Sequence, residues 1–207
     1  MTMQTFLRRV AQLLSFVFHP VFVPTYAAIL YMSLFRGYFS LSGRVSIVSV
    51  VFMLTAMIPA VTLLVAINCG RVDNFMVSNR LQRPLIYCVA IIATTACTFF
   101  VWLSGLGVYA TLTMIGCTVA LIISVIVNIW WKISAHSMAA GAACGAIFSF
   151  GLGFAINNIL LQCAALLIAG LVCAARIYLR EHTLMQTLAG FVVGCACTCS
   201  VLWIWSL

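Results

Sequence analysis

The sequence contains very little charge, and almost none of that charge is acidic. Only 6% of its 207 residues are Asp, Glu, Lys or Arg, and Asp73 and Glu181 are the two acidic residues. A soluble globular domain has roughly one quarter charged residues. With 66% hydrophobic residues and a mean hydropathy of +1.25, the chain lacks the polar surface that a water-soluble fold needs. The composition therefore excludes a soluble domain and predicts an integral membrane protein in a lipid bilayer.

Proline is also scarce, with four residues, so the apolar runs are long. A helix needs about 20 mainly apolar residues to cross about 30 Å of hydrocarbon. We predict an all-α, polytopic transmembrane helix bundle that forms one integral membrane domain over residues 1–207. The apolar runs predict about seven crossings, with six as the alternative, near residues 10–34, 45–67, 85–103, 107–131, 137–154, 157–175 and 184–205.

Two short segments decide how these runs are divided. Ser104 to Gly107 is interpreted as a tight turn, because residues 85–131 are too long for one crossing. The basic start of the chain has no small-residue cleavage pattern before Pro20, so it is interpreted as part of a retained first span. Within that span, His19 beside Pro20 is either a packing contact at a kink or a supporting residue of a functional site.

The sequence lacks the patterns of a metal site and of a nucleic-acid-binding face. Most of its ten cysteines lie within apolar runs, where a protonated thiol behaves as a small hydrophobic group. Cys195, Cys197 and Cys199 have neither CxxC spacing nor a nearby His. The formal charge is +8, but the cations interrupt hydrophobic runs and form no exposed basic face. We therefore predict no metal, no cofactor and no nucleic-acid partner.

The cations are divided unevenly between the two sides of the predicted bundle. With seven crossings, the N-terminus and the connections after the second, fourth and sixth helices share one side. Eight of the ten cations fall there: Arg8, Arg9, Arg71, Arg80, Arg83, Lys132, Arg176 and Arg180. Arg36 and Arg44 fall on the other side. This bias would place the crowded side in the cytoplasm, although cations that are kept to bind an anion would give the same count.

Three polar segments fall on the crowded side. They are SNRLQRP at 78–84, WKISAHS at 131–137 and ARIYLREHTLMQTLAG at 175–190. Together they hold two histidines and at least four cations, with too few carboxylates to pair them. Arginine offers a planar fork to phosphate oxygens, and the amides at a helix start add further donors. The three segments therefore predict a site for an anionic partner, with phosphate as the natural candidate.

The third segment has the most informative spacing. His182, Gln186 and Gly190 follow one another at intervals of four residues, which places them on one face of a helix. The amide oxygen of Gln186 would accept a hydrogen bond from one ring nitrogen of His182, which fixes the tautomer and leaves the other nitrogen as a nucleophile. Gly190 would let another helix approach closely. Glu181 is expected to point about 100° away from this face.

The second segment supplies another histidine. His136 is expected to open the fifth helix, with Ser134 as its cap or as a phosphate ligand. Gly141 and Gly145 in the same helix have GxxxG spacing, which favours close helix packing near the site. Two imidazoles suggest two roles. One would attack phosphorus to form a phosphohistidine, and the other would protonate the leaving oxygen, without a metal.

In this order the segments resemble the three motifs of the type-2 phosphatidic acid phosphatase superfamily, KxxxxxxRP, PSGH and SRxxxxxHxxxD. In the first motif, Arg83 and Pro84 match the RP pair. Met76 stands at the Lys position, and Arg80, one helical turn before Arg83, would supply the missing cation. The second motif keeps its Ser and His as Ser134 and His136, and Lys132 adds a charge beside them.

The third motif keeps its spacing from Arg176 to His182, with Gln186 where the family has Asp. The chain is also similar to a divergent bacterial branch with a KISxH second motif, an HTxxQxxxG third motif and an N-terminal HPxxxPT segment, here His19 to Thr25. The resemblance covers a phosphatase-like core at residues 78–194.

The resemblance implies a membrane phosphatase, in a bacterial inner (cytoplasmic) membrane, that acts on a lipid phosphate or a polyprenyl or other lipid diphosphate. It implies His182 as the nucleophile and His136 as the general acid. The implied phosphate-binding residues are Arg176, Arg83, Arg80, Lys132 and Ser134. The family's usual six spans and outward site conflict with seven spans and an inward basic bias, and the sequence predicts no oligomeric state.

Gln186 leaves two interpretations open. A neutral amide orients a histidine but does not stabilise its cationic form as a carboxylate does. The protein is then either a phosphatase tuned to a more reactive substrate such as a diphosphate, or a catalytically weakened relative that binds or moves an anionic lipid.

Overall fold

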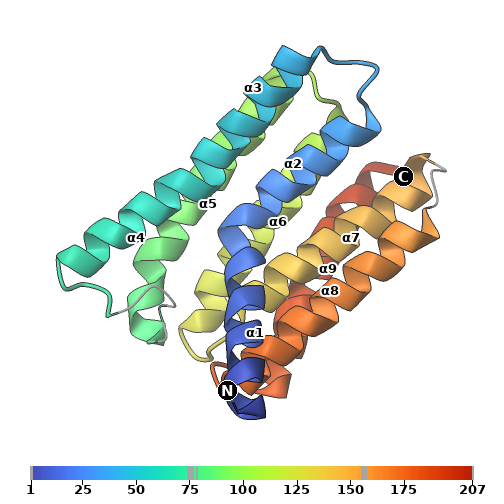
Figure 1. Cartoon of the computed structure of the whole chain (residues 1–207). Coiled ribbons are helices and arrows are strands. Elements are labelled where there is room, and N and C mark those ends of the chain that lie inside the picture. The colour runs from blue at the N-terminus through green and yellow to red at the C-terminus, as the bar shows by residue number, and fades with distance from the viewer. Residues whose placement is uncertain (1, 74–76, 78, 155–157, 207) are drawn as a thin grey trace.

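The computed structural model describes residues 2–73, 77, 79–154 and 158–206, and these residues form helices joined by short loops, with no strand among them (Figure 1). The helices in chain order are α1 (Met3–Val17), η1 (Pro20–Phe22), α2 (Val23–Leu34), α3 (Leu41–Phe52), the π-helical turn η2 (Met53–Met57), α4 (Ile58–Asn68), η3 (Arg80–Gln82), α5 (Arg83–Leu103), α6 (Val108–Asn128), α7 (Ala135–Phe154), α8 (Ile159–Tyr178) and α9 (Leu184–Ser206).

Six stretches of the described residues are long and apolar enough to cross a membrane. They are Met3–Leu34, Leu41–Asn68, Arg83–Leu103, Val108–Asn128, Ile159–Tyr178 and Leu184–Trp203. The 20-residue helix α7 lies among them in the bundle. The two termini lie at opposite ends of the bundle (Figure 1). The prediction of a polytopic helical membrane protein is confirmed.

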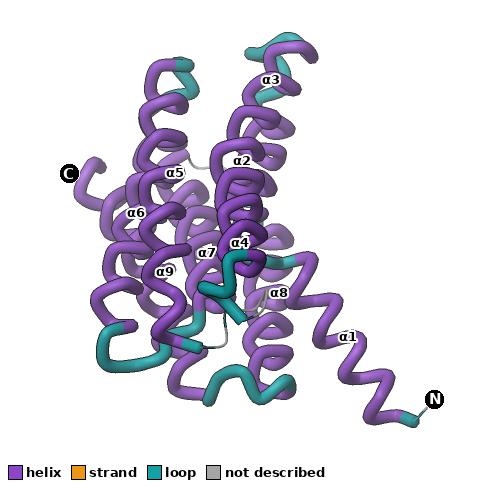
Figure 2. Tube along the Cα trace, turned by 90° about the vertical axis from the view of Figure 1, so that its left-hand side faces the viewer, coloured by secondary structure: helices purple, strands orange, loops and turns teal. Residues whose placement is uncertain are grey.

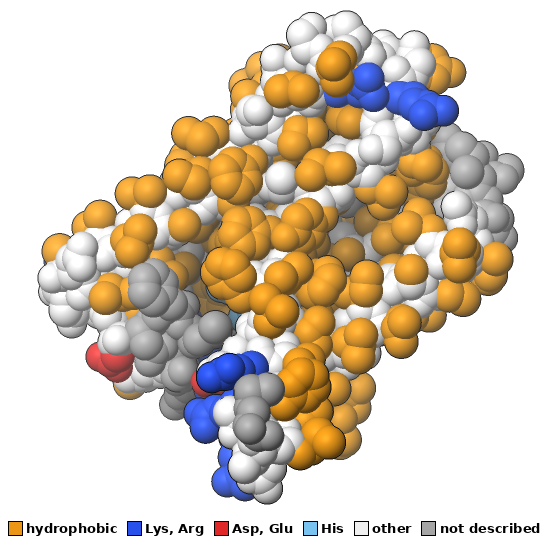
Figure 3. Space-filling model, in the orientation of Figure 1, with side chains coloured by type: hydrophobic (Ala, Val, Ile, Leu, Met, Phe, Trp, Pro, Cys, Tyr) orange, Lys and Arg blue, Asp and Glu red, His pale blue; other side chains and the backbone are white. Residues whose placement is uncertain are grey.

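The surface follows the same division. Hydrophobic side chains cover the flanks of the visible face, whereas Lys and Arg side chains gather at its two ends (Figure 3). A lipid-facing belt with charges confined to the ends is the arrangement that the bilayer imposes, because charges are costly in hydrocarbon.

The first predicted helix, 10–34, is wrong in two respects. It starts earlier, at Met3, where the Thr2 hydroxyl accepts a hydrogen bond from Thr5 N–H at 3.3 Å. It is also interrupted, because α1 ends at Val17 and His19 caps the short helix η1 by accepting from Val21 N–H at 3.5 Å. As a result α1 leaves the bundle at an angle and packs against α8 (Figure 2).

The turn predicted between residues 104 and 107 is confirmed. Gly105 and Gly107 have φ angles of +65° and +92°, which residues with a Cβ rarely adopt. The two glycines therefore let α5 and α6 reverse direction within four residues. The Tyr31 hydroxyl donates to the Leu106 carbonyl at 2.6 Å and ties this turn to α2.

Among the described helices, α7 and α9 pack most closely, and they run parallel. A Cβ atom on Gly190 would lie 2.6 Å from the Ser134 carbonyl oxygen, and one on Gly145 would lie 2.6 Å from the Cys195 carbonyl oxygen. Gly141 faces α9 in the same way at Phe191. The backbones therefore touch, which confirms the close packing predicted for these three glycines. Because the pair is parallel, both N-termini lie at the same end of the bundle.

Candidate functional site

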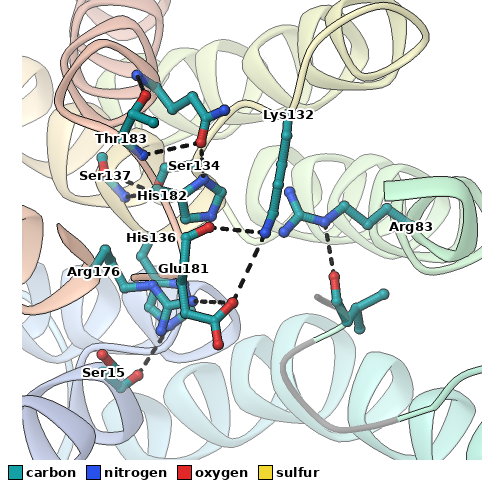
Figure 4. Close-up of polar contacts among 12 residues, drawn as sticks. Ser15, Arg83, Lys132, Ser134, His136, Ser137, Arg176, Glu181, His182 and Thr183 are labelled. Atoms are coloured by element: carbon teal, nitrogen blue, oxygen red, sulfur yellow. Dashed lines mark hydrogen bonds and ion pairs between the residues drawn. The ribbon is translucent and has the colours of Figure 1, made fainter. Parts of the chain in front are cut away.

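The three polar segments meet at one end of the bundle (Figure 4). An Arg83 guanidinium N–H at the start of α5 donates to the Ile133 carbonyl at 3.0 Å and joins the first segment to the second. Lys132 Nζ donates to the Glu181 carbonyl at 2.8 Å and joins the second to the third. The N-termini of α5, α7 and α9 therefore converge here, and their dipoles favour an anion.

His182 lies in the loop between α8 and α9, so the prediction that it lies on the same helix as Gln186 is wrong, but the predicted contact with Gln186 is present. The Gln186 Oε1 atom lies 3.1 Å from His182 Nδ1 and also accepts from Thr183 N–H at 3.1 Å. Because a backbone N–H only donates, this second bond identifies the Gln186 atom as the oxygen. His182 Nδ1 therefore carries the proton, and Nε2 has a free lone pair in the neutral ring.

Gln186 has a second role that the sequence analysis missed. Its backbone N–H donates to the Thr183 hydroxyl at 3.4 Å, while its side chain accepts from Thr183 N–H. These reciprocal bonds form a capping box. The sequence pattern Thr-x-x-Gln at 183–186 is typical of a capping box and would have predicted it. One amide oxygen therefore both caps α9 and sets the tautomer of His182.

The surroundings of His182 keep it neutral. The residue is 6% exposed. Burial, followed by the cationic charges of Arg83, Lys132 and Arg176, lowers the pKa of His182 to about 3, and the Gln186 hydrogen bond opposes this shift. Three cations from all three segments thus act on one imidazole that has an unprotonated nitrogen near neutral pH. This combination suits nucleophilic attack on an anion.

His136 lies in the first turn of α7, as predicted, and is buried. Its Nε2 atom lies 3.1 Å from the Ser15 carbonyl oxygen, so Nε2 carries a proton. The His19 ring packs edge-on against the His136 ring, with 5.0 Å between the centroids. The end of α1 and the break after it therefore form one wall of the site. No sequence motif marks the contribution of Ser15, because it is made by the backbone.

Ser134 is fully buried, and its hydroxyl caps α7. It accepts from Ser137 N–H at 3.4 Å and lies 2.8 Å from the Ser137 hydroxyl. The Ser134 N–H in turn donates to the Gln186 carbonyl at 3.3 Å. Of the two roles considered for Ser134, the structure therefore shows the cap. The cap holds the start of α7, and with it His136, against the start of α9.

Arg83 is 5% exposed and is held by two carbonyl groups. Besides the bond to Ile133, its Nε–H donates to the Val77 carbonyl at 2.9 Å. Arg80 begins η3, but its side chain lies outside what the structure describes, as does Met76. The proposed replacement of the family's lysine by Arg80 therefore stays a prediction.

The expectation for Glu181 is wrong. Glu181 precedes α9 and does not lie on it, and its Oε2 atom is 3.9 Å both from Lys132 Nζ and from an Arg176 guanidinium nitrogen (Figure 4). The cation cluster therefore already holds one carboxylate. Burial and the Arg83 charge lower the pKa of Lys132, and the Glu181 charge opposes this.

The end of α8 explains where Glu181 points. Arg180 has a φ angle of +56°, and the Glu181 N–H donates to the Arg176 carbonyl at 3.1 Å while Arg180 N–H donates to the Ile177 carbonyl at 2.9 Å. These two bonds form a Schellman motif, in which glycine usually occupies the left-handed position. Because the sequence has Arg there, the reversal was not visible beforehand, and helical spacing was wrongly applied to Glu181.

An apolar pocket of about 270 Å³ lies among α2, α6, α7 and α8. Its lining reaches Ala140, one turn after His136 on α7, and Val172, one turn before Arg176 on α8. From Val172 it continues to Leu161, about 16 Å along α8 at 1.5 Å per residue. The pocket therefore runs from the buried edge of the polar site into the membrane-spanning part of the bundle.

Comparison with known proteins gives one match. A family model described as the PAP2 superfamily matches residues 113–207, which include the second and third segments and the helices α7, α8 and α9. No curated protein and no solved structure matches the chain. The family match confirms the resemblance at the level of the superfamily. The first segment, at 78–84, lies outside the matched residues.

Proposed function

We propose that the chain removes phosphate from a lipid phosphate or lipid diphosphate in the membrane, because its residues 113–207 match the PAP2 superfamily, whose general activity is that of a phosphatase. The observation that carries this proposal is the state of His182: its ring is neutral, its Nε2 lone pair is free, and the cations of Arg83, Lys132 and Arg176 surround it. Cations bind the phosphoryl oxygens, and a neutral imidazole attacks phosphorus.

The reaction would proceed in two steps. His182 Nε2 forms a bond to phosphorus while the bond from phosphorus to the lipid oxygen breaks, and His136 gives that oxygen a proton. Water then attacks the phosphohistidine, His136 takes the proton of the water, and inorganic phosphate leaves with His182 restored. Since His136 Nε2–H is bonded to the Ser15 carbonyl, the transferred proton would be carried on Nδ1, so His136 would enter the first step doubly protonated and regain that form when it takes the proton of the water. No metal takes part in this scheme.

The remaining residues have supporting roles in the proposal. Arg176, Arg83 and Lys132 bind the phosphoryl oxygens, and Arg80 adds a fourth cation. Ser134 caps α7, and its hydroxyl donates a hydrogen bond to a phosphate oxygen. His19 positions His136 through the ring contact at 5.0 Å. The apolar pocket supports a lipid substrate, because a hydrocarbon chain that enters it leaves the head group one helical turn away, beside His136 and Arg176.

The test is phosphate release from a panel of lipid phosphates and diphosphates by the purified chain. We expect His182→Ala to abolish release, because no other group in the scheme can accept the phosphoryl group. Leu184→Ala, at an exposed position two residues away, is the matched control and should keep full activity. Undiminished release by His182→Ala, with an unchanged melting temperature, would refute the role of His182.

A second function is favoured by one observation: a neutral amide, already engaged in the cap of α9, occupies the position of the family's carboxylate. The protein would then bind or move an anionic lipid without cleaving it. In that case the lipid panel would raise the melting temperature of the protein and release no phosphate.

A further inference from the structure

We propose that Glu181 is a displaceable internal counterion of the phosphoryl site and that it sets the affinity of the site for phosphate. Its carboxylate lies between Lys132 and Arg176, in the position that a phosphoryl oxygen would take when substrate binds. This inference rests on the proposed function, because it identifies those two cations as phosphate ligands.

The geometry shows a single carboxylate oxygen shared by both cations. Glu181 Oε2 lies 3.9 Å from Lys132 Nζ and 3.9 Å from an Arg176 guanidinium nitrogen. Charge-assisted hydrogen bonds between nitrogen and oxygen are shorter, about 2.7–2.9 Å. Both contacts are therefore loose, and a phosphate with several oxygens can make shorter ones to each cation.

The exposure of the three side chains indicates which one moves. The Arg176 side chain is 2% exposed, whereas those of Lys132 and Glu181 are 24% and 25% exposed. Glu181 therefore reaches a buried guanidinium from the partly exposed rim of the site. Its carboxylate can leave toward water without opening the bundle, and Arg176 stays in place.

The backbone of the loop is fixed independently of this carboxylate. The N–H groups of Glu181 and His182 both donate to the Arg176 carbonyl, at 3.1 and 3.4 Å, and Lys132 donates to the Glu181 carbonyl. The carboxylate can therefore be displaced by a side-chain rotation that leaves the backbone of the loop in place. His182 keeps its position while the phosphate enters.

The charges lead to a functional consequence. Without Glu181, the described cations Arg83, Lys132 and Arg176 would hold inorganic phosphate, the product, with no internal competitor. With Glu181, the product competes with a tethered carboxylate and leaves more readily. Glu181 thus weakens phosphate binding and limits inhibition by the product.

The experiment measures binding of inorganic phosphate to the full chain in detergent, from the shift of the melting temperature with phosphate concentration at constant ionic strength. We expect Glu181→Gln, which keeps the shape and removes the charge, to lower the dissociation constant at least about tenfold, roughly the effect of removing one close like charge. Asp73→Asn is the matched control, since it removes the same charge from the chain's other acidic residue, and should leave the constant within about twofold.

A double substitution tests the mechanism. In a Lys132→Met background, Glu181 has lost one of the cations that it faces, so the effect of Glu181→Gln should shrink. An unchanged or weaker phosphate affinity in Glu181→Gln would overturn the proposal, and so would an absence of phosphate binding in both wild type and variant. Glu181→Ala should tighten binding in the same direction, which keeps the test valid if the glutamine variant folds poorly.

Failure of this proposal and failure of the proposed function are distinguishable, because phosphate binding needs no turnover. A chain that releases no phosphate from lipids but binds phosphate more tightly as Glu181→Gln keeps this inference and loses the phosphatase function. A chain that releases phosphate from lipids but whose affinity for inorganic phosphate is unchanged by Glu181→Gln keeps the phosphatase function and loses this inference.

Discussion

Two groups of helices in the bundle are packed by different means. In the α7–α9 pair, glycines bring backbone against backbone. In the α2, α3, α5 and α6 region, large side chains such as Met32, Val101 and Met114 fill the space between the helices. The tight pair lies within the family match at residues 113–207 and holds the starts of two helices at the site. The comparison indicates that the geometry of the candidate site depends on fixed backbones, whereas the region of α2, α3, α5 and α6, the softer region, is held together by side-chain contacts.

The largest effect on stability is expected from a substitution of Gly194, which lies in the contact between α7 and α9. A Cβ at Gly194 would overlap the Met138 carbonyl oxygen and lie 2.8 Å from Ala142 N, so Gly194→Leu must push α9 away from α7. We expect loss of the folded protein, measured by size-exclusion elution and thermal unfolding. Gly170→Leu is the matched control, because nothing lies within 4 Å of a Cβ there.

The same experiment has a counterpart in the softer region. Met32→Ala removes a buried side chain, and such changes cost about 2–5 kcal/mol, so the protein should still fold but melt earlier. Equal loss of folded protein from Gly194→Leu and Met32→Ala would contradict the proposed difference between the two regions.

The second prediction concerns the pH dependence of the candidate site, at the starts of α7 and α9. The pKa of His182 is about 3, and protonation removes the nucleophile, so the loss of kcat/KM that His182 causes should begin only below about pH 4. Gln186→Glu keeps the capping box but places a carboxylate beside Nδ1, which favours the cationic ring. The pH below which kcat/KM falls should therefore rise by about 1–3 units. A pH profile of phosphate release measures the shift.

Thr183→Ala is the control for that prediction. It removes the bond from Gln186 N–H to the Thr183 hydroxyl but leaves the amide oxygen on His182. Its pH profile should therefore match that of the wild type even if its stability falls. A profile that moves equally in both variants would show that the cap, and not the carboxylate, controls His182.

The smallest predicted effect concerns the end of α8. Arg180 adopts a left-handed conformation that costs a residue with a Cβ about 1–2 kcal/mol. Arg180→Gly should relieve part of this and raise the free energy of unfolding by up to about 1 kcal/mol, measured by denaturant unfolding in detergent. Arg180→Ala keeps the Cβ and should not stabilise. If both variants behave alike, the conformation of Arg180 is not the source of the effect.

Much of this arrangement was predictable because hydropathy and spacing report directly on it. Apolar runs predicted the long helices, and paired glycines predicted the α7–α9 contact. The four-residue spacing predicted the contact of His182 with Gln186. The errors arose where local backbone geometry decided the outcome. A kink at His19 was one of the interpretations, but the full break there depends on a cap, and the position of Glu181 depends on Arg180 adopting a conformation that its residue type disfavours.

The hydrogen bond between His136 and the carbonyl of Ser15 has a consequence for how such a site can change over time. A side-chain ligand is lost by one substitution, but a carbonyl belongs to every residue, so position 15 can drift among small amino acids that fit its fully buried place without losing the bond. What must be preserved is the register of α1 against α7. The positions that matter for His136 are therefore those that fix this register, and residue identity at position 15 is a poor guide to them.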